Sequence, residues 1–272
     1  MRSVYLYIAC LALVIAGCSD DPVNNNDNDN TPPDKFVSIA SQTTGQHQYA
    51  IYALDSLKTG YNEVYISIGN SQDEAVEIED PLVTPLMHMA DMMHSAPVSK
   101  VETVEKKGRP YLKAEVYFTM ASMGDDYWTL KIEGETEDGA VLEEEIRVAV
   151  AAGGLQAKKK VNDRMYILSY VQPKTPVVGG DTYEVALHYQ ESMMKFPAVT
   201  GAEVTIAPFM DMGGGEGHEA PDVDEIAEEQ GAGHYGGQIV YNMSGEWKLT
   251  FTATLEDGTE ITFSTFEIMV EG

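Results

Sequence analysis

An internal repeat constrains this chain more than any other feature of its sequence. Residues 128–132 (WTLKI) lead into a Glu-Asp-Gly turn at 137–139, and residues 247–251 (WKLTF) lead into the same turn at 256–258 with identical spacing. In both copies every second residue is large and apolar, which is the period of a half-buried β-strand. The offset of about 120 residues exceeds the period of solenoid repeats. The repeat therefore predicts two tandem domains of one fold.

Short alternating segments recur through both halves. Examples are residues 63–68 (EVYISI) and 111–120 in the first half, and 182–189 in the second. Glycine, proline and Asp/Asn turns separate these segments, and no window of comparable length has a convincing helical period. We expect one short acidic helical turn, at 223–229. Six or seven short strands in each copy predict an all-β chain of two tandem Ig-like antiparallel β-sandwich domains.

The N-terminal residues predict targeting. The apolar run 4–16 follows Arg2 and is too short to span a membrane, and residues 15–18 (IAGC) are typical of a lipobox. We expect a lipoprotein signal peptide over residues 1–17 and lipidation of Cys18. The mature protein would then be held in the cell envelope by its lipid anchor only, on a face that the sequence leaves open. An uncleaved anchor helix is the alternative.

The remaining boundaries follow from composition. Residues 18–44 contain few apolar side chains beside many Asn and Asp, so we expect a disordered tether after the lipidated cysteine. We place the first sandwich at residues 45–150. Residues 151–160 combine an Ala-Ala-Gly-Gly run with three lysines and are interpreted as a linker. The second sandwich then covers residues 161–272.

Charge and cysteine content exclude several functions. The formal net charge of −27 argues against nucleic acid as a partner. Cys10 and Cys18 are the two cysteines of the chain, and both belong to the signal peptide and its lipidation site. The mature domains therefore lack thiolate metal ligands and Cys-based catalysis. The sequence also lacks a nucleophilic serine elbow, a phosphate-binding loop and a metalloprotease helix, so we predict that it is not an enzyme.

Methionine and histidine gather at corresponding places in the two copies. Residues 85–97 (PLMHMADMMHSAP) contain four methionines and two histidines, and residues 208–221 repeat the pattern around a glycine-rich insert. Thioether and imidazole ligands select soft ions such as Cu(I), whereas zinc favours more histidine or cysteine. We expect one copper(I) site at one end of each sandwich. The predicted ligands are Met87, Met89, His94 and Met123 in the first copy, and Met210, Met212, His218 and Met243 in the second.

These motifs, in their order along the chain, resemble the YtkA-like domain, a relative of FixH. The resemblance is carried by a Tyr-x-x-Val strand, Met-x-Met with a nearby His, Gly-x-x-Tyr, and Met-x-Gly-x-Trp at 243–247. The first copy departs from the last motif, because one extra residue separates Met123 from Trp128. The resemblance implies small exported or membrane-anchored β-sandwiches tied to copper handling and cytochrome oxidase assembly.

Two functions follow from the sequence. The first is a lipid-anchored extracytoplasmic protein that buffers copper(I) or exchanges it with a donor or acceptor protein in the cell envelope. The alternative is a non-catalytic structural, adhesion or protein-binding surface lipoprotein that binds no metal. In that case methionine would act as the adaptable packing residue that it is in many cores and contact surfaces.

Overall fold

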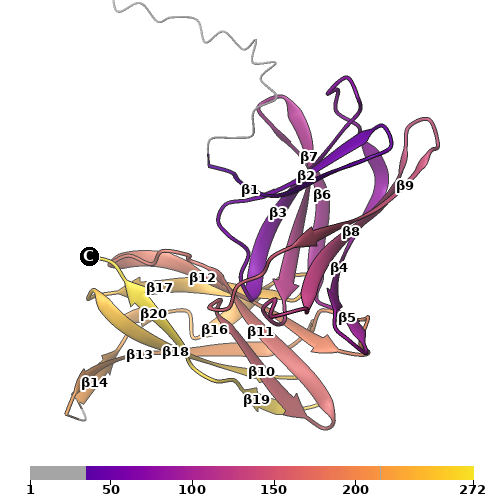
Figure 1. Ribbon diagram of the computed structural model, residues 1–272. Helices are drawn as coiled ribbons and strands as arrows, with labels where there is room; N and C mark the ends of the chain where they lie inside the picture. The colour runs from indigo at the N-terminus through magenta and orange to yellow at the C-terminus, as the bar shows by residue number, and fades with distance from the viewer. Residues whose placement is uncertain (1–34, 215) are drawn as a thin grey trace, which may run out of the picture.

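The structure is a computed structural model that describes residues 35–214 and 216–272, and all of its regular elements there are β-strands (Figure 1). The predicted all-β class with antiparallel sheets is confirmed by these strands and their pairing. No helix in the described part of the chain is long and apolar enough to cross a membrane. The predicted signal peptide and Cys18 lie outside the described residues.

The first sandwich has two sheets. The five-stranded sheet has the order β1 (Val37–Thr44), β2 (His47–Ala53), β3 (Gly60–Gly69), β7 (Arg109–Phe118), β6 (Val98–Lys106). The four-stranded sheet has the order β5 (Met93–Ser95), β4 (Ile78–His88), β8 (Tyr127–Thr136), β9 (Val141–Val148). Alternating residues of both sheets, among them Val64 and Trp128, are buried in one core between the layers.

The second sandwich repeats this plan. Its strands follow the order β10 (Gln156–Val161), β11 (Arg164–Gln172), β12 (Gly179–Gln190), β17 (His234–Tyr241), β16 (Ile226–Gly231), β13 (Glu203–Gly213), β18 (Gly245–Thr254), β19 (Glu260–Thr262). Three further strands pair at its sides: β14 (Glu216–Glu219) with β13, β15 (Asp222–Val223) with β17, and β20 (Phe266–Val270) with β18. Because β16 pairs with both β13 and β17, it joins the two layers. Trp247 lies fully buried in this core, as Trp128 does in the first.

The observed strands differ from two of the predicted boundaries and from the predicted helical turn. Strand β1 pairs with β2, so the fold begins at Val37 and the tether prediction is wrong for 37–44. Strand β10 pairs with β11, so the predicted linker ends before Gln156. The segment predicted to be a helical turn at 223–229 is instead extended, in β15 and β16. All three are polar segments at a sheet edge or crossover, where backbone pairing outweighs a weak apolar pattern.

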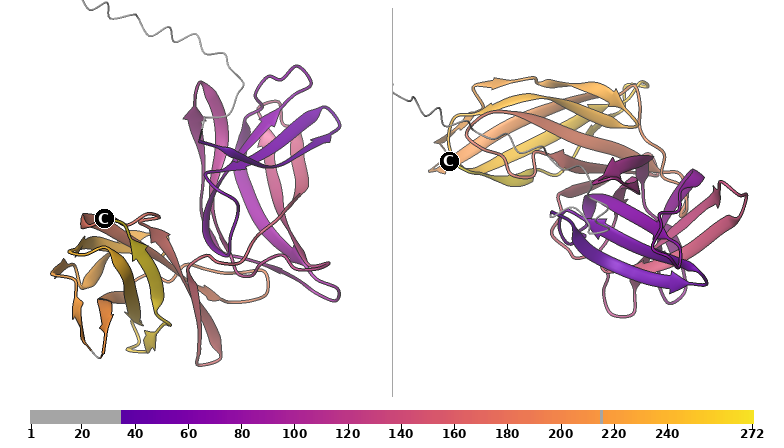
Figure 2. Two further views of the ribbon diagram at one scale, coloured as in Figure 1. Left: turned by 60° about the vertical axis from the view of Figure 1, so that its left-hand side comes forward. Right: turned by 90° about the horizontal axis from the view of Figure 1, so that it is seen from above.

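The two sandwiches meet through a tight backbone junction, and Figure 2 shows their long axes inclined to one another. Ala151 N donates to Leu57 O and Thr59 N donates to Ala151 O, both at 2.9 Å. Gly154 lies three residues after Ala151, and a Cβ added to it would lie 1.5 Å from Thr59 O. The junction therefore requires glycine at position 154 because a backbone oxygen occupies the space of a side chain.

We expect Gly154→Ala to destabilise the protein by about 1–3 kcal/mol, the usual cost of overpacking, because Thr59 O can move only with its backbone. Gly180→Ala is the matched control, since a Cβ there meets no atom within 4 Å and its φ is not positive. Chemical denaturation followed by tryptophan fluorescence measures both. Equal unfolding free energies for the two variants would contradict the described junction.

Candidate metal centres and the domain interface

The Met/His end of the first sandwich brings two predicted ligands, Met87 and His94, beside Trp128. Met87 on β4 lies opposite His94 on β5 and opposite Trp128 on β8. Cross-strand partners project from the same face of a sheet, so these three side chains point into the same end of the core. Met87 and Trp128 have no exposed surface, and His94 is buried.

The hydrogen bonds of His94 define which ring nitrogen is free. Nδ1 of His94 lies 2.7 Å from Ser95 O, and because a carbonyl only accepts, Nδ1 carries the proton. In the neutral ring Nε2 then keeps its lone pair, and it lies 3.4 Å from Met120 Sδ. The Trp128 indole N–H donates to Met120 O at 2.9 Å, which holds that methionine in place.

The separation of these two ligand atoms suits a shared metal ion. With metal–nitrogen and metal–sulfur bonds of about 2.0 and 2.3 Å, a 3.4 Å N···S distance corresponds to a ligand–metal–ligand angle of roughly 100–105°. That angle is close to tetrahedral. A neutral imidazole and a thioether cannot hydrogen-bond to each other through two lone pairs, so a soft cation is a natural third partner.

The second sandwich repeats the main contacts of this arrangement. Met210 lies opposite His218 in the β13–β14 register. His218 Nδ1 donates to Glu219 O at 3.0 Å, and the Trp247 indole N–H donates to Met243 O at 3.0 Å. The His218 ring stands edge-on to Trp247 at 5.3 Å, as His94 does to Trp128 at 5.4 Å. Within the described residues, His218 Nε2 is buried without a hydrogen-bond partner.

The other predicted ligands are less closely grouped. Met89 and Met210 are half-buried and pack against their cores. Met123, Met212 and Met243 are 75%, 58% and 41% exposed. The structure therefore brings Met120, not Met123, to His94, and Met120 was missing from the predicted set. The equivalence is seen only in the structure, where Met120 O and Met243 O accept the indole hydrogen bonds of Trp128 and Trp247, because eight positions separate Met120 from Trp128 and four separate Met243 from Trp247.

The described residues contain no group of three or more His, Cys, Asp or Glu side chains able to hold a metal ion. A hard-metal site of carboxylates, as calcium requires, is therefore absent from residues 35–214 and 216–272. Any metal at these ends would depend on thioether sulfur.

A buried polar network joins the two sandwiches at a separate place. Nδ1 of His234 on β17 donates to Glu184 on the neighbouring strand β12. Its Nε2 donates across the interface to Tyr117 OH at 2.8 Å and lies 3.2 Å from Glu115 Oε2. A donor chain runs on from Tyr117 OH to Ser99 Oγ at 2.9 Å, and from there to Glu115 Oε2 at 2.7 Å. With both nitrogens donating, the imidazole is a cation between two carboxylates.

Burial alone would lower the pKa of His234, but the hydrogen bonds and charges of Glu115 and Glu184 outweigh it and raise that pKa to about 9. Burial tends to raise the pKa of Glu115, yet its bonds from His234 and Ser99 leave it lowered. His188 packs on Tyr117 with ring centroids 4.6 Å apart. Its burial, followed by the charge of His234, lowers its pKa to about 3, so His188 stays neutral. Tyr117, Val171 and Ala186 form a small apolar cluster around this network.

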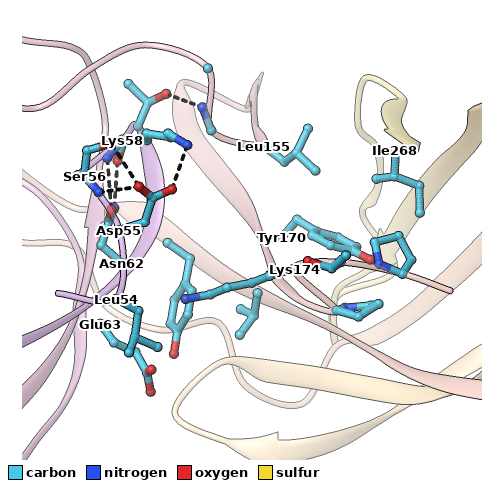
Figure 3. Close-up of a pocket in the computed structure, with 18 of the residues that line it drawn as sticks. Leu54, Asp55, Ser56, Lys58, Asn62, Glu63, Leu155, Tyr170, Lys174 and Ile268 are labelled. Carbon is cyan, nitrogen blue, oxygen red and sulfur yellow. Dashed lines mark hydrogen bonds and ion pairs between the residues drawn. The ribbon is translucent and has the colours of Figure 1, made fainter. Parts of the chain in front are cut away.

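A cleft of about 490 Å³ opens beside the network, between the sandwiches. Figure 3 shows Lys58 and Asp55 of the first sandwich on one wall and Tyr170, Lys174 and Ile268 of the second on the other. Lys58 Nζ bonds Asp55 at 3.1 Å, and Lys174 Nζ lies 5.7 Å from the centre of the Tyr61 ring, within cation–π range. The volume of the cleft falls within the range of small-ligand pockets, about 300–1,000 Å³.

No family model matches the chain, and no curated protein matches it. Among solved structures it is similar to the FdeC adhesin of Escherichia coli, at 18% identity and a TM-score of 0.26, with 85% of this chain and 65% of that chain covered. It is also similar to domains 5-6 of the S-layer protein SbsC, at 15% identity and a TM-score of 0.32, with 87% and 97% covered. The fold assignment rests on the strands and cores described above, and the YtkA-like resemblance stays a prediction from motifs.

The raised pKa of His234 predicts that the protein loses stability at alkaline pH. Because the folded pKa of His234 is raised to about 9, its contribution is fully present below 6.5 and is lost as pH rises through 9. Between pH 7 and pH 10 the wild type should lose about 2–3 kcal/mol more unfolding free energy than His234→Gln. Urea denaturation at both pH values measures this difference. His47→Gln, away from the interface, is the control, and a pH dependence equal in all three proteins would refute the assignment.

Proposed function

We propose that this chain is a non-catalytic structural or protein-binding protein of the cell envelope, in which two Ig-like sandwiches act as one rigid arm. The interface network carries this proposal. Domains joined by polar interfaces move relative to each other by default. Here an imidazolium is buried between carboxylates of both sandwiches, and removing one partner of such a group costs about 3–5 kcal/mol. A fixed angle between the domains suits a spacer. The same fixed angle keeps the cleft and the residues around it in one constant arrangement.

The predicted anchor supports the same role. Lipidation at Cys18 would attach the arm to a membrane, and residues 19–34 would separate the two. The net charge of −27 supports a role outside nucleic-acid binding and opposes tight adhesion to anionic lipid.

Rigidity is tested by the distance between spin labels at Glu137→Cys and Glu260→Cys, one in each sandwich. The mature chain has no other cysteine apart from the lipidation site, so the labelling is selective. We expect one narrow distance distribution, which broadens when His234→Ala is added and not when His47→Ala is added. A broad distance distribution in the labelled protein with His234 unchanged would argue against a rigid arm.

A second candidate function is the binding of a soft metal, copper(I), at the Met/His end of each sandwich. One observation favours it: His218 Nε2 is buried without a hydrogen-bond partner beside methionine and tryptophan. Leaving such an atom unsatisfied costs about 1–3 kcal/mol. Metal-bound histidines commonly donate their other ring N–H to a backbone carbonyl, as both His94 and His218 do. Envelope donors or acceptors of the ion would be the partners, as the YtkA-like resemblance implies.

Silver(I), a redox-stable stand-in for Cu(I), tests this candidate by calorimetry and native mass spectrometry. We expect His94→Ala and His218→Ala each to remove one equivalent, and His47→Ala to remove none. Metal at a hundredfold excess over Kd should stabilise the wild type by about 2.7 kcal/mol. If the methionines only fill the cores, silver will leave the melting temperature of the wild type unchanged.

A further inference from the structure

Four exposed methionines gather on two turns, one from each sandwich, and we call them the methionine patch. Its members are Met92, Met93, Met193 and Met194, which are 54%, 44%, 41% and 48% exposed. Met92 ends the turn before β5, which Met89 N closes by donating to Met92 O at 3.0 Å, and Met93 is the first residue of β5. The second pair forms the tip of the turn after β12, where Ser192 N donates to Lys195 O at 3.2 Å.

A backbone hydrogen bond brings these distant turns into contact. Ser95 N of the first sandwich donates to Met193 O of the second at 2.8 Å. Figure 1 shows the end of β12 reaching β5 at this point. Met93 is two residues from Ser95 on the same strand, and alternate residues of a strand share a face. The exposed methionines of two segments 100 residues apart therefore flank one backbone contact between the sandwiches.

Packing alone is a weak reason for such a group. A methionine with about half of its surface in water buries little, and its sulfur is open to oxidation. Within the patch, Met193 Sδ accepts a hydrogen bond from Gln190 Nε2 at 3.6 Å, which orients one sulfur at the surface. Thioethers are uncharged at every pH and bind soft cations in preference to zinc or calcium. The chain's net charge of −27 raises the local concentration of cations around this surface.

We infer that the methionine patch is a third soft-metal site, an all-thioether site for Cu(I) or Ag(I) to which both sandwiches contribute ligands. It shares its metal chemistry with the second candidate function but none of its ligands. His94 directly follows Met93 on β5, and successive residues of a strand face opposite sides, so the patch and the buried site lie on opposite faces of that strand.

Silver(I) titration of the full mature chain, read by native mass spectrometry, tests the inference. Wild type should bind three equivalents, and a variant with all four patch methionines changed to Leu should bind two. Leucine keeps the volume and apolarity of methionine, so its melting temperature should stay within about 2 °C of wild type. Met193→Leu with Met194→Leu should weaken the third equivalent at least tenfold, because ligands from both sandwiches are needed. Met269→Leu, a methionine that is 61% exposed and belongs to none of the predicted metal sites, is the control.

Peroxide footprinting places the ion by residue. Silver should slow the oxidation of the four patch methionines together and leave Met269 unaffected. Three equivalents retained by the quadruple variant would overturn the inference, as would an equal loss in the Met269→Leu control. In that case the patch is a contact surface for protein. If the histidine variants are silent while the patch variant loses an equivalent, the patch site stands and the buried sites fail.

Discussion

The arrangement of this molecule depends on one buried cation. His234 lies between Glu184 of its own sandwich and Glu115 of the other, and its bond to Tyr117 OH continues through Ser99. Each sandwich has its own core, so neither needs the other for its apolar burial. The network joins the two sandwiches together with the backbone bonds of Ala151 and the bond from Ser95 N to Met193 O. The cleft lies between the sandwiches as well.

Duplication explains the second theme, the two Met/His ends. The same register sets methionine opposite histidine, and the same indole-to-carbonyl bond positions a methionine before the tryptophan. The copies differ at the second ring nitrogen: Nε2 of His94 faces Met120 sulfur, whereas Nε2 of His218 is buried without a partner in the described structure. The unpartnered Nε2 of His218 therefore favours a ligand at the second end. At the first end two candidate ligand atoms, Nε2 of His94 and Sδ of Met120, already lie 3.4 Å apart.

Much of the fold could be read from the sequence because the repeat lies in the strands that form the cores. Residues 128–132 and 247–251 alternate strictly, and their inward side chains are fully buried. Strands β1, β10 and β16 escaped prediction because they lie at a sheet edge or a crossover, where backbone pairing holds segments whose apolar pattern is weak. Met120 was missed because an irregular segment before Trp128 shifts the spacing. The pairing of His234 with Glu115 could not be predicted from the sequence, because only the packing of the two domains brings together residues that are 119 positions apart in the chain.

The central claim is that His234 is a buried imidazolium holding the two sandwiches together. Selective ¹⁵N labelling of histidine and a pH titration of the ring nitrogens by NMR test this directly. The account predicts that His234 keeps protons on both nitrogens through neutral pH and titrates near 9. A His234 ring that titrates near 6.5, as an exposed histidine does, would contradict it.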